Sequence, residues 1–181
     1  MLKTFALTLF ASLLMAGAAF AQKPVTVGGA PMYANKNIIQ NAVNSKDHTT
    51  LVAAVKAAGL VETLQGPGPF TVFAPVNDAF GALPAGTVDN LLKPENKKQL
   101  TAVLTYHVVA GRYNAAALQR LIKKGGGKAT LKTVQGEQLT ATSSGETITI
   151  TDAKGGAAKV TISNVNQSNG VIHVIDKVLL P

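Results

Sequence analysis

The 181-residue sequence contains no cysteine and no tryptophan. Without cysteine the chain forms no disulfide, carries no lipid on an N-terminal cysteine and offers no thiol nucleophile. A hydrophobic core must therefore stabilise the folded state, and the chain is long enough to bury one as a single domain. Histidine is scarce, with only three residues. Because a transition-metal site needs several converging ligands, we expect neither a metal ion nor another cofactor.

An apolar run lies close to the N-terminus. Lys3 precedes it, and the run from Phe5 to Ala16 is too short to span a bilayer comfortably. Ala19-Phe20-Ala21 then has the small-x-small pattern of a signal-peptidase site. We predict a signal peptide over residues 1–21 and a secreted or periplasmic mature protein with no stable membrane insertion after cleavage. The alternative is an uncleaved membrane anchor.

Acidic residues are few compared with basic ones. Removal of Lys3 leaves 16 basic against 9 acidic residues, so the mature chain carries a net charge of +7. This charge favours acidic partners such as anionic polysaccharide, membrane surfaces or nucleic acid. Nucleic acid fits poorly, because the chain is exported and its few aromatic residues do not interleave with basic ones. The densest basic cluster, Lys123, Lys124 and Lys128, is typical of a solvated loop.

The sequence pattern divides the mature chain into an arm and one domain. Residues 22–36 are rich in glycine, proline and small side chains, which is typical of a flexible arm. Beyond it, apolar residues recur first at helical spacing and later with the alternation of strands. The expected helices lie near residues 38–43, 51–58, 94–107 and 114–122. The expected strands lie near residues 70–74, 129–133, 138–142, 147–151, 160–162 and 171–180. Helices followed by an antiparallel sheet indicate an α+β domain.

Three segments resemble the fasciclin domain family. They are Thr71 to Phe80 (TVFAPVNDAF), Tyr106 to Val109 (YHVV) and Asn169 to Pro181 (NGVIHVIDKVLLP), called the signature segments below. Each segment alone is a weak match, but their order and spacing also fit. The resemblance covers residues 37–181, which we take as the fasciclin domain.

This resemblance implies a compact α+β fold, in which two small β-sheets form a wedge and a cluster of α-helices packs against it. It also implies an extracellular or cell-surface role in adhesion or matrix contact, and no enzymatic activity defines the family. In animal members the Tyr-His region has been linked to integrin contact. The acidic motifs associated with that contact have no clear match here, so we do not extend it to this chain.

We interpret the polar and turn-forming residues of the signature segments as structural. His107 continues the apolar helix face that includes Val103 and Leu104, which predicts a core histidine with both ring nitrogens paired. His173 lies on an apolar strand face and has the same interpretation, whereas His48 is expected to be exposed. The residues assigned to the structural motif are Thr71, Pro75, Asn77, Asp78, His107, Asn169, Gly170 and Asp176.

Asp176 attracts attention because strand periodicity places it with Val174 and Val178 on an apolar face. A buried carboxylate needs a partner, since burying it bare costs several kcal/mol. The candidate partners are backbone N–H groups, His107 and Thr71. We interpret Asp176 as a structural link between the last strand and the first signature segment; the alternative is catalytic acid–base work.

Candidate partner contacts are Tyr106, Arg112 and Tyr113, because tyrosine and arginine are common anchors of interfaces. The alternative is that both tyrosines cap the core with their hydroxyl groups in water. No Gly-x-Ser-x-Gly elbow and no phosphate-binding glycine motif occurs. The sequence therefore offers no local signature of a hydrolase, although a Ser-His-Asp triad is defined by geometry rather than by spacing.

The leading functional hypothesis is an exported non-catalytic binding module for cell adhesion or for surface and matrix interaction. It would bind a cell-surface or matrix macromolecule through a surface patch, and the positive charge fits an anionic polysaccharide. The runner-up is a periplasmic small-ligand carrier or sensor with an apolar cleft between sheets and helices. An enzyme, for example a hydrolase, is the third hypothesis.

Overall fold

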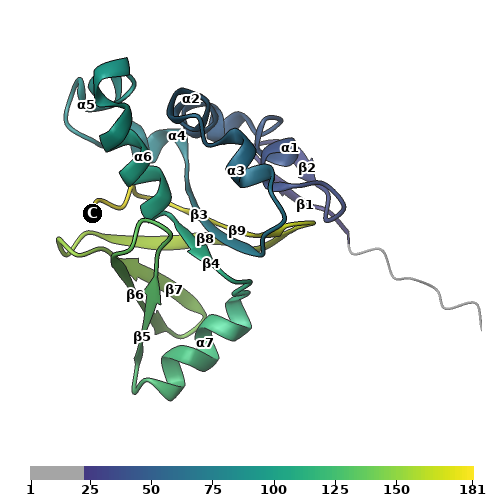
Figure 1. Cartoon of the computed structure of the whole chain (residues 1–181). Helices are drawn as coiled ribbons and strands as arrows, with labels where there is room; N and C mark the ends of the chain where they lie inside the picture. Colours follow the sequence, from purple (N-terminus) through teal and green to yellow (C-terminus); the bar gives the residue numbers. More distant parts are fainter. Residues whose placement is uncertain (1–22) are drawn as a thin grey trace, which may run out of the picture.

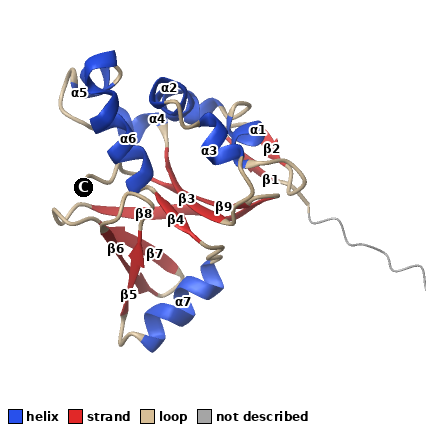
Figure 2. Ribbon diagram, in the orientation of Figure 1, coloured by secondary structure: helices blue, strands red, loops and turns tan. Residues whose placement is uncertain are grey.

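The computed structural model describes residues 23–181, and the predicted signal peptide over residues 1–21 lies outside this part of the chain. Helices gather on one side of a bent sheet, and one further helix lies against its other end (Figures 1 and 2). The α+β class expected from the sequence is confirmed. Within the described residues, no helix is both long and apolar enough to cross a membrane.

The helices are short and are ended by local signals. They are α1 (Ile38–Ala42), α2 (Thr49–Ala58), α3 (Val61–Gln65), α4 (Asn77–Gly81), α5 (Thr87–Leu91), α6 (Lys97–Tyr106) and α7 (Ala115–Lys124). The side chains of Asn37 and Asn114 cap α1 and α7 by accepting backbone N–H groups. Gly59 ends α2 at φ 73°, a left-handed conformation that favours glycine.

One long strand joins two halves of the main sheet and produces the wedge. The strands are β3 (Phe70–Pro75), β4 (Val108–Ala110), β5 (Lys128–Lys132), β6 (Gln138–Ser144), β7 (Thr147–Thr151), β8 (Ala157–Gln167) and β9 (Gly170–Ile175). Their spatial order is β4-β3-β9-β8-β7-β6-β5. The start of β8 pairs with β7, and from Val160 onward β8 pairs with β9, with register shifts on both sides of Ile162. Such irregularities bend a strand, so β8 serves both arms of the wedge.

The two signature strands lie side by side at the centre. β3 pairs with β9 in parallel, from Phe70 opposite Gly170 to Pro75 opposite Ile175. The sheet is therefore mixed. The sequence pattern predicts a purely antiparallel sheet, and this prediction is wrong for the pair β3 and β9. The central position expected for the last strand is confirmed, but this strand ends at Ile175 rather than at residue 180.

β3 and β9 separate two hydrophobic cores. On one side, α1 to α6 pack over Val72, Ile172 and Val174 to form what we call the helix-side core. On the other side, α7 and strands β5 to β8 pack against Phe73 and Ile175 to form the α7-side core. Successive side chains of a strand point to opposite faces, so the same two strands supply both cores.

The N-terminal segment differs from the expected flexible arm. β1 (Val25–Val27) and β2 (Ala30–Met32) form an antiparallel hairpin whose Val27 and Met32 are buried in the helix-side core. Gly28 and Gly29, at φ 57° and 76°, make its two-residue turn. The composition indicated a linker because the same glycine pair serves linkers and tight hairpins. Asn41 fixes the hairpin, since its Oδ1 accepts from Tyr33 N at 3.0 Å.

Candidate functional site

Thr71 holds the loop after β4 against β3. Its side chain is fully buried, and its Oγ1 donates to the Gly111 carbonyl at 2.7 Å and accepts from Tyr113 N at 2.9 Å. Both hydrogen-bonding functions of the hydroxyl are thus used inside the protein. Thr71 connects the first signature segment to residues 111–113, which lead into α7.

Asn77 and Asp78, at the start of α4, have different environments. Asn77 Oδ1 accepts from Thr50 N at 3.0 Å, and its Nδ2 donates to the Lys46 carbonyl at 2.8 Å. Asn77 therefore caps α2 from a distant part of the chain. Asp78 is exposed in the first turn of α4, where a negative charge is favourable.

His107 is buried and bound at both ring nitrogens. Its Nδ1 lies 2.8 Å from the Val103 carbonyl, and its Nε2 accepts from Leu179 N at 3.0 Å. Because a carbonyl only accepts and a backbone N–H only donates, Nδ1 carries the proton of a neutral ring. Burial lowers the pKa of His107 from 6.5 to about 4. The ring therefore ties α6 to the C-terminal segment and stays uncharged at neutral pH.

Tyr106 is not available to a partner. Its ring is fully buried in the α7-side core, and its hydroxyl donates to the Gln138 carbonyl at 3.1 Å and accepts from Ala153 N at 3.0 Å. Burial raises the pKa of this hydroxyl. The structure thus removes Tyr106 from the candidate partner contacts, and the hydroxyl is bound to backbone instead of lying in water.

Asn169 and Gly170 join the start of β9 to the helices. Asn169 Oδ1 accepts from Ile38 N at 3.1 Å, and its Nδ2 donates to the carbonyls of Leu64 and Gly66 at 2.7 and 2.9 Å. A Cβ atom on Gly170 would collide with the Phe70 carbonyl. Glycine at this position lets β3 and β9 approach closely at the first pair of their register.

Asp176 does not lie on the buried apolar face that strand periodicity predicts. It is half-buried, and its Oδ1 accepts from Lys159 N at 2.8 Å. Its own N–H donates to the Lys159 carbonyl at 3.2 Å. Asp176 therefore links the end of β9 to β8, and neither His107 nor Thr71 is its partner. The alternation fails here because β9 stops one residue earlier, at Ile175.

The buried carboxylate of the domain is Asp152, which the sequence reasoning missed. Its Oδ1 accepts from Lys154 N at 3.0 Å and Gly156 N at 2.7 Å, while its Oδ2 accepts from Leu180 N at 3.0 Å. It fixes the turn after β7 and anchors the C-terminal segment. An aspartate that opens a glycine-rich turn is a known signal for such side-chain-to-backbone bonds, and it was available in the sequence.

The other two histidines are also buried. His48 was expected to be exposed, but its Nδ1 lies 2.9 Å from Ser45 Oγ and its Nε2 lies 3.4 Å from the Ala74 carbonyl. His173 stacks on Phe73 with ring centroids 5.8 Å apart, and its Nε2 lies 2.7 Å from the Tyr113 carbonyl. Its buried Nδ1 has no hydrogen-bond partner among the described residues, so the prediction that both ring nitrogens are paired is wrong for His173. Burial lowers the pKa of both rings.

These side chains do not form a catalytic or metal-binding cluster. The described residues contain no group of three His, Cys, Asp or Glu that could hold a metal ion. The Ser45–His48 pair is buried, and a backbone carbonyl rather than a carboxylate orients the ring. Neutral His48 on a carbonyl lacks the orienting acid of a nucleophilic triad. The contacts of Ser45 and His48 therefore serve the fold.

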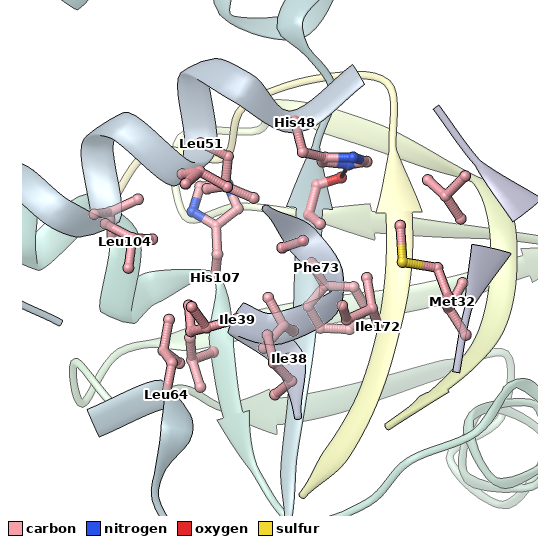
Figure 3. Close-up of a pocket in the computed structure, with 18 residues that line it drawn as sticks. Met32, Ile38, Ile39, His48, Leu51, Leu64, Phe73, Leu104, His107 and Ile172 are labelled. Carbon is pink, nitrogen blue, oxygen red and sulfur yellow. Dashed lines mark hydrogen bonds between the residues drawn. The ribbon is translucent and has the colours of Figure 1, made fainter. Parts of the chain in front are cut away.

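An apolar cavity lies in the helix-side core, between α1, α2 and the central strands (Figure 3). Its volume is about 40 Å³. Pockets for small organic ligands typically measure about 300–1,000 Å³, so this cavity is far too small for such a ligand in the present conformation. His48 and His107 lie on its wall, where the nitrogens of both rings already contact protein atoms.

Arg112 and Tyr113 remain as surface candidates. Arg112 is exposed, and its Nη2 donates to the carbonyls of Gln167 and Ser168 at 3.0 and 3.3 Å. Tyr113 is half-buried and lines an open hollow beside α7 together with Leu121 and Thr133. The structure therefore places Arg112 at the turn between β8 and β9 and Tyr113 at the surface of α7.

Comparison with known sequences identifies relatives over most of the described chain. A family model described as the Fasciclin domain matches residues 46–181. The chain is 46% identical over 162 residues to Protein sll1483 of Synechocystis sp., with 88% of this chain and 82% of that protein covered. It is also 32% identical over 166 residues to the cell surface glycolipoprotein MPB83 of Mycobacterium bovis, with 89% and 68% covered.

A comparison of structures identifies the same fold. The fold matches a FAS1 domain pair from the insect cell adhesion molecule Fasciclin I with a TM-score of 0.72 and 17% sequence identity. The match covers 81% of this chain and 51% of that one. At this identity the similarity concerns the fold, which agrees with the wedge implied by the three signature segments. The chain is a member of the fasciclin domain family.

Proposed function

We propose that the protein is an exported, non-catalytic adhesion module that binds a cell-surface or matrix macromolecule through its exterior. One observation carries this proposal: most polar side chains of the signature segments are used in hydrogen bonds within the protein. Thr71, His107 and Asn169 each bind backbone groups of other segments. Such side chains stabilise the fold and are not free to act on a substrate.

The relatives support an extracellular role. Fasciclin I is described as an insect cell adhesion molecule, and MPB83 is described as a cell surface glycolipoprotein. Extended to this chain, these descriptions agree with the predicted signal peptide over residues 1–21. Mass spectrometry of the exported protein tests this part of the proposal. A mature N-terminus at Gln22 is expected, and a chain that retains Lys3 would contradict it.

The partner that fits the charge of the mature chain is an anionic polysaccharide. A net charge of +7 attracts polyanions, and salt weakens this attraction. At physiological ionic strength the attraction is screened beyond a Debye length of about 8 Å. We expect the mature protein to bind immobilised alginate, a polyuronate, and to pass through neutral dextran. Elution should move to earlier fractions as sodium chloride increases. Absence of binding to alginate, or retention that ignores salt, would refute charge-driven recognition.

A small-ligand carrier is the second candidate, because the apolar cavity lies between the helices and the sheet as such a function requires. The cavity would have to expand well beyond its volume of about 40 Å³. Native mass spectrometry of the purified protein distinguishes the two functions. The adhesion proposal predicts the mass of the bare chain, whereas an additional small molecule lost on denaturation would support the carrier.

A further inference from the structure

The positive charge of the mature chain is concentrated in one stretch of sequence. Residues 37–95 contain three lysines against five acidic residues, and residues 137–181 contain three lysines against four acidic residues. Residues 96–136 contain no acidic residue at all. The net charge of this stretch is therefore set by its basic residues alone. They are Lys97, Lys98, Arg112, Arg120, Lys123, Lys124, Lys128 and Lys132.

Most of these residues surround one helix and one strand. Lys97 and Lys98 begin α6, whereas the others lie on α7, on β5 or in the loop before α7. All of those others are exposed. Within residues 23–181 none of their nitrogen atoms lies within 4.0 Å of a carboxylate oxygen. Their charges are therefore not neutralised by ion pairs inside the described part of the chain.

Helix α7 and strand β5 leave an open groove between them. Two adjoining hollows of about 450 and 520 Å³ share Leu121 and Thr130, so they form one continuous depression. Tyr113 lines one end, and the basic lining residues along it are Lys124, Lys128 and Lys132. We call this surface the α7–β5 groove.

The local sequence explains why the groove stays open. α7 buries Leu118 and Ile122 in the α7-side core, which leaves Leu121 37% exposed. β5 is the outermost strand in the sheet order, and its Ala129 and Leu131 point inward while Lys128, Thr130 and Lys132 point outward. A strand rises about 3.3 Å per residue, so Lys128 and Lys132 stand roughly 13 Å apart along the groove.

We propose that the α7–β5 groove is the binding site for an acidic polysaccharide chain. The carboxylate or sulfate groups of the chain pair with Lys124, Lys128 and Lys132, and apolar faces of sugar rings pack on Leu121 and Tyr113. This inference rests on the proposed function, because it names the surface through which adhesion occurs. A long open groove suits an extended polymer, whereas a closed pocket would suit a small molecule.

Other polyanions fit the groove less well. Single-stranded nucleic acid is bound by successive aromatic side chains on which bases stack, and Tyr113 is the single aromatic residue that lines the groove. A membrane surface favours a helix with a broad apolar face directed outward, but α7 turns Leu118 and Ile122 into the core. The exposed hydroxyl of Thr130 suits a polyhydroxylated ligand, because it can both donate and accept hydrogen bonds.

Two variants of equal charge test the groove. The groove variant carries Lys124→Gln, Lys128→Gln and Lys132→Gln, and the control variant carries Lys56→Gln, Lys93→Gln and Lys98→Gln. All of these lysines are exposed, and those of the control lie on the helix side. Binding of the mature proteins to alginate is measured at several salt concentrations, and dextran serves as the neutral probe. Thermal unfolding confirms that each variant is folded.

The groove variant should bind alginate at least about tenfold more weakly than wild type, with a smaller salt dependence, because three charge pairs are lost. The control variant should stay within about threefold. Equal weakening of both variants would overturn the groove while leaving the proposed function intact. Absence of wild-type binding to alginate would refute the proposed polysaccharide partner itself. Tighter wild-type binding to oligodeoxythymidine or to phosphatidylglycerol vesicles would overturn the assignment to a polysaccharide.

Discussion

The helix-side core and the α7-side core share β3 and β9 but differ in what surrounds them. On the helix side, residues 37–106 carry five lysines and five acidic residues and therefore no net charge, and the core contains the apolar cavity with His48 and His107 on its wall. On the α7 side, the surface is basic and carries the open groove. The buried polar side chains on the helix side bind other parts of the protein and so stabilise the fold. The exposed lysines on the α7 side have no such partners among the residues that the structure describes, which leaves them free for the proposed recognition.

Acidification should produce the largest change in the free energy of unfolding, because it protonates His107 on the wall of the cavity. The pKa of His107 is about 4 in the folded protein and near 6.5 when unfolded, so the unfolded chain binds the proton first. Stability is therefore complete above pH 6.5 and falls as the pH decreases toward 4, by about 3 kcal/mol in total from this residue. Urea unfolding at a series of pH values measures the effect.

The variant His107→Gln serves as the control for this prediction. Glutamine does not titrate in this range, so its free energy of unfolding should change less between pH 6.5 and pH 4 than that of wild type. The burial-lowered pKa values of His48 and His173 contribute in the same direction and remain in the variant. An identical pH profile in both proteins would show that His107 has no part in the acid sensitivity.

Asn169→Ala should destabilise the helix side by about 2 kcal/mol. The substitution leaves the N–H of Ile38 and the carbonyls of Leu64 and Gly66 without their side-chain partner. Asp78→Ala, at an exposed residue of another signature segment, should change the free energy of unfolding by less than about 0.5 kcal/mol. Chemical denaturation of both variants would sharpen the distinction, and equal losses would contradict the structural role of Asn169.

Substitutions of Asp152 and Asp176 should differ less in their effect on the free energy of unfolding. Asp152→Ala removes three backbone contacts of a buried carboxylate and should cost about 2 kcal/mol. Asp176→Ala removes one side-chain contact at a half-buried residue and should cost about 1 kcal/mol or less. Melting temperatures of the two variants rank these effects. The reverse order would restore Asp176 as the main anchor.

The smallest effect on stability should come from the groove. Replacing Lys124, Lys128 and Lys132 by glutamine should change the free energy of unfolding by less than about 0.5 kcal/mol, because these exposed side chains make no ion pairs within residues 23–181. The same substitutions are expected to weaken alginate binding. A large loss of stability in urea would mean that these lysines support the fold rather than recognition.

Much of the fold could be predicted because its signals are local. The order of helices and strands follows from periodicity and from caps such as Asn114, and the signature segments identify the family. The parallel pairing of β3 with β9 could not be predicted, because its partners lie about a hundred residues apart and alternation does not encode direction. The hairpin at Gly28-Gly29 is a local feature, but its glycine pair occurs in linkers as well as in tight turns, so composition alone indicates a linker.

The candidate site was less predictable than the fold. Strand periodicity placed Asp176 wrongly once β9 ended at Ile175, and it gave no reason to consider Asp152. His48 is buried by tertiary packing that brings its Nε2 to the Ala74 carbonyl, a residue of another element. The basic cluster at Lys123, Lys124 and Lys128 was visible in the sequence, but only the folded chain shows that β5 adds Lys132 to the same groove.

Chemical-shift mapping tests most directly whether recognition lies outside the core. Titration of the isotopically labelled mature protein with an alginate oligosaccharide should shift the amide signals of Leu121, Lys124 and Thr130 and leave those around the cavity unchanged. Shifts concentrated at Ile39, Leu51 and His107 instead would place the ligand in the helix-side core and contradict a purely structural role for the signature segments.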